Sequence, residues 1–120
     1  IKGRPWFCQT RITFEDFSKV DIRTGTIIEV NNFPKARKPA YQLTIDFGKL
    51  GVRKSSAQIT ELYTKEELLN KQIVAIINFQ KKQIANFLSE CLILGIENNQ
   101  KKIVLLQASK KNLTNGEQIN

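Results

Sequence analysis

The strongest constraint on the fold is an alternating segment at residues 41–47. Tyr41, Leu43, Ile45 and Phe47 are apolar or aromatic, and the three residues between them are polar. A period of two places these apolar side chains on one face of an extended strand. The segment therefore predicts a strand with one buried face and one solvated face, as is common in antiparallel sheets.

A second predicted strand, residues 21–30, precedes it and is rich in β-branched side chains. Gly25 interrupts this strand, and a glycine inside a strand usually marks a bulge or a sharp bend. Residues 31–40 form the connecting loop, which two prolines stiffen. The cations of this loop, which contains no acid, are Lys35, Arg37 and Lys38. We therefore expect a bent strand that leads into a basic loop at the mouth of a small barrel.

Further strands are predicted along the rest of the chain. Residues 52–59 form a weak third strand, and residues 72–79 a fourth that is apolar almost throughout and hence buried on both faces. Residues 88–96 form a fifth strand, and residues 103–106 pair with it across a polar turn. Between the fourth and fifth strands, residues 80–86 are expected to be a basic loop that carries Lys81 and Lys82.

Two short helices are predicted by capping boxes, in which a threonine and an acid three positions later exchange hydrogen bonds with the backbone. The first covers residues 13–19 and begins at Thr13, and the second covers residues 64–70 and begins at Thr64. In an OB-fold the helix after the third strand plugs one end of the barrel. For the first helix, where Phe14 and Phe17 share a face, a simple plug over one end of the barrel is the plainest structural role.

Five or six short strands with a helix after the third predict an all-β protein with short helices, a five-stranded OB-fold Greek-key barrel. An immunoglobulin-like sandwich fits less well, because nothing in it explains the helix. The barrel domain is expected at residues 13–120, with N- and C-terminal extensions. Residues 1–12 are expected to be a loosely ordered tail or a remnant of the expression vector, and Asn115-Gly116 a turn in a polar C-terminal tail.

A formal net charge of +8 indicates a polyanionic partner, nucleic acid before membrane, although a basic surface without a partner is the alternative. Between residues 31 and 60 the cations face a single acid, Asp46; they are Lys35, Arg37, Lys38, Lys49, Arg53 and Lys54. Ser55 and Ser56 can donate hydrogen bonds to phosphate or a 2′-hydroxyl. Phe33 either stacks on an unpaired base or anchors the loop against the barrel rim.

Several classes of function are disfavoured by the composition. There is no histidine, the commonest general base and metal ligand, and no phosphate-cradling glycine loop appears. We therefore expect no catalysis, no metal and no cofactor. Cys8 and Cys91 are far apart and are expected to be free thiols in a reducing compartment. Without a run of about eighteen apolar residues we expect no membrane insertion and a cytoplasmic location.

Long motifs resemble one family. KARKPAY at residues 35–41, SSAQIT at residues 55–60 and FLSECLILG at residues 87–95 are similar to segments of the tRNA-binding domain family. These OB-fold modules occur at the C-terminus of methionyl-tRNA synthetases and as separate proteins. The resemblance runs from about Phe14 to Gly116 and is nearest to the small separate members that act as secretion chaperones in prokaryotes.

The resemblance implies a homodimer that binds tRNA without catalysis and also binds unfolded or exported polypeptides. The alternatives are a polypeptide-binding secretion chaperone with incidental RNA affinity, or a tRNA-binding module that aids an aminoacyl-tRNA synthetase. The family's loop motif falls on residues 33–41, where Phe33 replaces a histidine and Arg37 an acid, and its last motif keeps Ser89 and Glu90. The predicted nucleic-acid-binding residues are Lys35, Arg37, Lys38, Arg53, Lys54, Ser55, Ser56, Lys81, Lys82, Ser89 and Glu90, with Phe33 as the candidate for base stacking.

Overall fold

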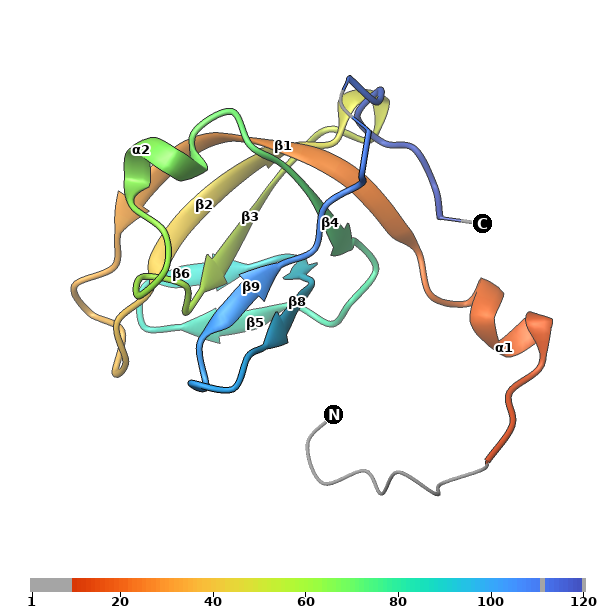
Figure 1. The fold of residues 1–120 in the computed structure, drawn as a ribbon, viewed down its shortest axis with the longest axis horizontal. Helices are drawn as coiled ribbons and strands as arrows, with labels where there is room; N and C mark the ends of the chain where they lie inside the picture. Colours follow the sequence, from red (N-terminus) through yellow and green to blue (C-terminus); the bar gives the residue numbers. More distant parts are fainter. Residues whose placement is uncertain (1–9, 111, 120) are drawn as a thin grey trace.

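A long, curved strand, β1, organises the barrel because it pairs with a different strand along each half of its length (Figure 1). The computed structural model describes residues 10–110 and 112–119. Its main sheet has the order β3-β2-β1-β4-β7, and neighbouring strands in it are antiparallel. The strands of this sheet are β1 (Ile22–Asn32), β2 (Tyr41–Asp46), β3 (Val52–Ala57), β4 (Gln72–Ile76) and β7 (Leu92–Ile93). The predicted OB-type barrel is confirmed.

The alternation that predicted β2 is reproduced in its burial. Tyr41, Leu43, Ile45 and Phe47 are all buried, whereas the polar residues between them are half-exposed. They pack with side chains from β1, β4 and the second helix in one core cluster. Burying each large apolar side chain stabilises the fold by about 1.5–3 kcal/mol, so this one face supplies much of the driving force.

Gly25 is where β1 passes closest to the core. A Cβ atom at this position would lie 2.7 Å from Ile45 Cγ2 and 2.7 Å from Phe47 Cδ1, so only glycine fits. The register shift of the β1–β2 ladder lies between Ile27 and Glu29. The bulge that a glycine often marks is therefore a few residues further on. The absence of a side chain at Gly25 lets β1 pack closely against Ile45 and Phe47.

Both capping boxes are present, but only one helix is a plug. In α2 (Lys65–Leu68) the Thr64 hydroxyl accepts a hydrogen bond from Glu67 N at 3.1 Å, and Leu68 is fully buried against the barrel. In α1 (Phe14–Ser18) the N-cap box also forms, yet the Phe14 side chain is 81% exposed. Figure 1 shows α1 standing away from the barrel. The second helix is therefore the plug, and a simple plug does not describe the first.

The second half of the chain departs most from the predicted strands. The expected fifth strand is split into β6 (Phe87–Ser89), β7 and β8 (Gly95–Glu97), and β4 ends at Ile76, not at residue 79. The expected loop at residues 80–86 contains β5 (Lys82–Ile84), which forms a hairpin with β6. The last predicted pairing is confirmed, because β8 pairs with β9 (Ile103–Leu105).

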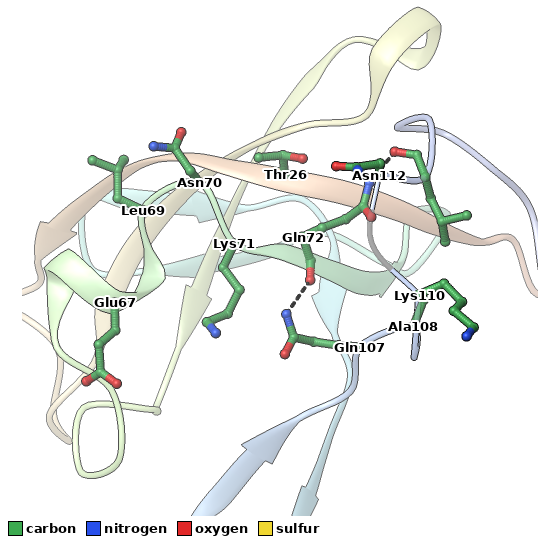
Figure 2. A pocket seen from close by; sticks show the side chains of 11 residues that line it. Thr26, Glu67, Leu69, Asn70, Lys71, Gln72, Gln107, Ala108, Lys110 and Asn112 are labelled. Carbon is green, nitrogen blue, oxygen red and sulfur yellow. Dashed lines mark hydrogen bonds between the residues drawn. The ribbon is translucent and has the colours of Figure 1, made fainter.

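The C-terminal segment completes the sheet along β1. Thr24 N donates to Glu117 O at 3.1 Å, and Gly116 N donates to Thr24 O at 2.7 Å, so the segment pairs with the edge of β1 that β2 leaves free. The predicted turn at Asn115 and Gly116 is confirmed. Upstream of this turn, Gln107 donates its side-chain amide to the Gln72 carbonyl oxygen at 2.9 Å (Figure 2). The tail is thus part of the barrel wall.

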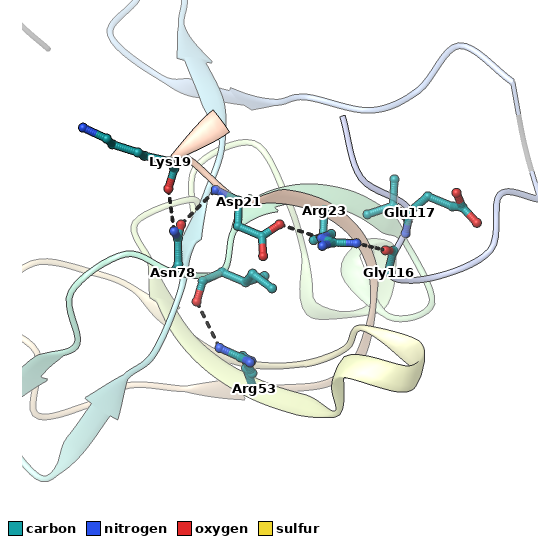
Figure 3. A network of polar contacts seen from close by, with 9 residues as sticks. Lys19, Asp21, Arg23, Arg53, Asn78, Gly116 and Glu117 are labelled. Carbon is teal, nitrogen blue, oxygen red and sulfur yellow. Dashed lines mark hydrogen bonds and ion pairs between the residues drawn. The ribbon is translucent and has the colours of Figure 1, made fainter. Parts of the chain in front are cut away.

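A polar network fixes the entry to β1 (Figure 3). The Asn78 amide donates to Lys19 O at 2.7 Å and accepts from Asp21 N at 2.9 Å, which determines the direction in which α1 leaves the barrel. The Arg23 guanidinium donates to Asp21 Oδ1 at 2.6 Å and to Gly116 O at 3.0 Å, which joins the two ends of the domain. Among the described residues, no helix is long and apolar enough to cross a membrane. Cys8, like the rest of residues 1–9, lies outside the described residues.

Candidate nucleic-acid interface

The gap between β3 and the end of β6 is closed by residues 89–91, which we call the clasp. The Glu90 carboxylate accepts from Lys54 N at 3.0 Å, and Glu90 N donates to Lys54 O at 2.8 Å. Two residues along, Ser56 N donates to Ser89 Oγ at 3.1 Å. Side chains here take the place of a regular ladder, and the edge of β3 is covered.

Three of the predicted RNA-contact residues form hydrogen bonds at the clasp. The acceptor atoms Ser89 Oγ and Glu90 Oε1 are both bonded to β3, so these side chains close the barrel. Ser55 is 1% exposed, and its hydroxyl donates to Cys91 O at 3.0 Å, so it offers nothing to a phosphate. The physical reason is the strand period, which turns Ser55 inward opposite Leu43 and leaves its neighbour Ser56 on the other face.

Cys91 is a buried free thiol at the centre of the clasp. Desolvation by burial raises its pKa to about 11, against a smaller lowering by the hydrogen bond with Ser55. At neutral pH it is therefore a protonated, unreactive packing residue.

Arg53 also faces inward, because it is paired with the buried Ile45 in the β2–β3 register. Its guanidinium donates to Ile77 O at 3.0 Å and ties β3 to the end of β4 (Figure 3). Lys54, one residue on, is exposed and lies opposite Thr44 on the outer face. Arg53 therefore lies on the inner face of β3, whereas Lys54 presents an exposed cation on the outer face.

Phe33 is 4% exposed, so its ring is not available to a base. It packs against Phe87 of β6 with ring centroids 5.5 Å apart, in a small cluster that also contains Ala40 and Ile84. This contact holds the loop of residues 31–40 on the β5–β6 hairpin. This placement fits the alternative, a loop anchor, and leaves little of the Phe33 ring exposed for a base to stack on.

Docking of the loop on the hairpin creates a cleft of about 580 Å³, which we call the basic cleft. Its cations come from two segments far apart in sequence, the loop and β5: they are Lys35, Arg37, Lys38 and Lys82. All four are exposed, and no acidic residue lines the cleft. Within the described parts of the chain none of the four forms an ion pair, so their charge is free to act on a ligand.

Neutral donors complete the basic cleft. Ser56, Gln58 and Gln83 line it with the cations and can donate to phosphate or sugar oxygens. The two glutamines were not predicted, and their only sequence signal is their position beside predicted residues. Lys81, the remaining predicted cation, is exposed but is not among the residues that line the cleft. Among residues 10–110 and 112–119 no group of three or more His, Cys, Asp and Glu could hold a metal.

An OB-type barrel with an unpaired basic cleft beside the loop between its first two strands defines a class, the oligonucleotide-binding domains. The family described as "Putative tRNA binding domain" matches residues 22–118, and this chain belongs to that family. The resemblance inferred from the sequence is thus confirmed.

Relatives and solved structures agree with this assignment. The chain is 36% identical over 110 residues to the methionine–tRNA ligase of Bacteroides fragilis, which is 92% of this chain and 16% of the ligase. It therefore spans about a sixth of that relative's length. Crystal structures of the chaperone CsaA are similar over 92% of this chain and 100% of theirs: that from Bacillus anthracis at 46% identity and TM-score 0.85, and that from Picrophilus torridus at 50% and 0.84.

Proposed function

We propose that this domain binds tRNA without catalysis, that the basic cleft grips the phosphate backbone, and that the domain works as a cytoplasmic homodimer without a cofactor. The observation that carries the proposal is the convergence of loop and hairpin cations, unopposed by any acid, in one cleft. Lysine and arginine that neutralise phosphates release counterions, which is the main source of affinity for a nucleic-acid backbone. Membership of the tRNA-binding family supports tRNA as the nucleic acid.

The structure allows the salt dependence to be estimated. Four cations line the cleft. At about 0.7–0.9 counterions per neutralised phosphate, four contacts give a slope of log K against log salt of about −3. Removing two of them should reduce the slope by about 1.5.

The test is a titration of labelled tRNA at several potassium chloride concentrations. The cleft variant R37A/K82A removes one cation from each wall, and K49A/K65A is the matched control because both lysines are exposed and neither lines the cleft. We expect weaker binding and a shallower slope for the cleft variant only. Equal affinities and slopes for the two variants would show that the basic cleft is merely solvated. The same incubations should return the tRNA intact.

The homodimer is supported by two features, the exposed apolar side chains at α1 and an apolar groove on the barrel. Ile12 and Phe14 are among the most exposed apolar side chains described. The hydrogen bonds of Asn78 hold the end of α1 at the start of β1. An apolar groove of about 750 Å³ runs between β1, β4 and the C-terminal segment, lined by Ile22, Val74, Leu94, Leu106, Leu113 and Ile119 among others. We assign this groove to α1 of the partner copy, since apolar burial would offset the cost of holding Phe14 in water.

Light scattering tests the homodimer directly. Wild-type protein should give about twice 13.8 kDa, and Phe14→Asp should give a folded monomer, because a charge at this position cannot be buried without a partner. Leu62→Asp, at an exposed apolar residue outside both α1 and the apolar groove, is the control and should stay dimeric. A wild-type monomer at micromolar concentration, or a dimeric F14D, contradicts the assignment.

A second candidate function, polypeptide binding as a secretion chaperone, is favoured by the outer face of the β8–β9 hairpin. Ile96 and Val104 are direct cross-strand partners and are 60% and 41% exposed. The similarity to CsaA, whose structures are described as those of a chaperone, points the same way. Apolar binding is not screened by salt. Suppression of aggregation of a denatured protein should therefore be insensitive to salt and to R37A/K82A, and should be lost in I96S/V104S. Loss of suppression in R37A/K82A would assign polypeptides to the basic cleft instead.

A further inference from the structure

A separate pocket of about 470 Å³ lies between the end of α2, the start of β4 and the segment from residue 107 to residue 113 (Figure 2). None of its lining residues lines the basic cleft. Its polar side chains are mainly carboxamides and lysines, so we call it the amide pocket: Asn70, Lys71, Gln72, Gln107, Lys110 and Asn112. Its size lies within the range of about 300–1,000 Å³ that is typical of small-molecule sites.

Hydrogen bonds hold the two glutamines in place. Gln72 Nε2 donates to Leu113 O at 2.8 Å and to Asn115 Oδ1 at 3.0 Å, and Gln107 Nε2 donates to Gln72 O at 2.9 Å. Both amide nitrogens are therefore committed to the fold. The side-chain carbonyl oxygens of the two glutamines accept no hydrogen bond from any described residue, and they remain available as acceptors.

The side-chain amides of the two asparagines form no hydrogen bond with a described residue, whereas the Asn70 backbone N donates to Ile27 O at 2.8 Å. Both have a left-handed backbone, with φ of 69° at Asn70 and 68° at Asn112, a conformation that asparagine tolerates better than most residues. Each carboxamide offers a donor and an acceptor side by side. The pocket thus presents fixed acceptors together with two complete amide edges.

Positive charge lies next to these amides. Lys71 is half-buried, and its ammonium lies 5.7 Å from the centre of the Tyr63 ring, a cation–π contact that restricts where the ammonium lies. Neither Lys71 nor Lys110 forms an ion pair with a described residue. The acid of the pocket, Glu67, has one carboxylate oxygen engaged by Thr64 N at 2.9 Å in the capping box of α2. The net charge of the lining favours an anion.

We propose that the amide pocket binds a nucleoside monophosphate unit. Asparagine and glutamine carboxamides match the paired donors and acceptors on the edge of a nucleobase, and lysines match its phosphate. Leu69 also lines the pocket and can cover one face of the base. An acidic polypeptide would satisfy the lysines, but peptides are usually recognised along a groove or a strand edge, not in a pocket of this size.

The same chemistry is available from two sources, a free mononucleotide or an unpaired nucleotide of an RNA. Nucleotide binding in the amide pocket does not depend on tRNA binding in the basic cleft, and each proposal can fail without the other. In R37A/K82A, tRNA binding should be weakened while the nucleotide still binds. In K71A, the nucleotide should bind about tenfold more weakly while the salt slope of tRNA binding changes by no more than about one contact.

The experiment is an NMR titration of the whole chain that follows backbone and side-chain amide signals. The probes are the four nucleoside 5′-monophosphates, adenosine, inorganic phosphate, a short unpaired oligonucleotide and an acidic peptide. We expect saturable shifts at Asn70, Lys71 and Gln107 with at least one monophosphate, and binding about tenfold weaker for adenosine and for inorganic phosphate. If the source is RNA, the oligonucleotide binds more tightly than the monophosphate; if it is a free nucleotide, it does not.

Variants distinguish a built site from a general attraction. K71A and Asn70→Gly, which keeps the left-handed backbone accessible, should each weaken the monophosphate about tenfold, and the control K65A should change it by less than about twofold. Urea unfolding confirms that each variant is folded. No saturation at about 10 mM of any nucleotide or oligonucleotide, shifts equal to those of inorganic phosphate, or tighter binding of the acidic peptide would each overturn the proposal.

Discussion

Adjacent serines on β3 offer a matched pair for testing the two roles that the structure assigns to this strand. Ser55 points into the barrel, where its hydroxyl donates to Cys91 O at 3.0 Å across the clasp. Ser56 points to the basic cleft, and its hydroxyl donates no hydrogen bond to a described residue. The two single substitutions to alanine therefore remove the same group from the same strand in two different environments.

The magnitudes follow from burial. Ser55 is 1% exposed, so S55A leaves a buried carbonyl without its partner, at a cost of about 1–3 kcal/mol of unfolding free energy. For a domain of this size that corresponds to a fall in Tm of about 4 °C or more. S56A should cost less than about 0.5 kcal/mol, because the lost hydroxyl was half-exposed. If Ser56 donates to phosphate, S56A should weaken tRNA binding about threefold to tenfold.

Urea unfolding gives the unfolding free energy of each variant, and tRNA titration at a temperature where both are folded gives the affinity of each. We expect stability to fall only in S55A and affinity to fall only in S56A. Equal stabilities for the two variants would refute the clasp as a stabilising contact. A loss of tRNA affinity in folded S55A as large as that in S56A would refute the inward orientation of Ser55.

Three further predictions concern the core, the clasp and the loop. Gly25→Ala places a methyl group 2.7 Å from Phe47 Cδ1 and should cost about 1–3 kcal/mol in urea unfolding; Phe47→Leu should relieve part of this, so additive effects of the two changes would contradict the steric argument. Because the Cys91 pKa is raised to about 11 from 9.0, the unfolded thiol ionises first as pH rises; stability should be unaffected below pH 9 and fall by at most about 2–3 kcal/mol by pH 11, and this part of the pH dependence should be absent in Cys91→Ala. Phe33→Leu should destabilise the fold by about 1 kcal/mol through the lost Phe87 contact, without changing the preference among unpaired bases; a changed base preference would restore the stacking role.

Local patterns predicted the elements of this domain well. The alternation at residues 41–47 and the two capping boxes each depend on residues within seven consecutive positions, and the structure reproduces all three. The order of strands around a helix after the third was sufficient to predict the OB-type barrel. The cations of residues 35–38 were likewise predicted where the basic cleft forms. For the strand and the two capping boxes, the signal comes from short-range backbone geometry, which the sequence carries directly.

The orientation of individual side chains was decided by contacts across long separations. Phe33 is buried by Phe87, Arg53 bonds to Ile77, and Ser56 is held by Ser89, pairs that are distant in sequence and adjacent only after the barrel closes. Four of these residues were predicted from the sequence as ligand contacts because their chemistry suits RNA: Phe33, Arg53, Ser56 and Ser89. Tertiary structure alone determined which of them meet the barrel, because a buried polar group must find its partner inside the fold.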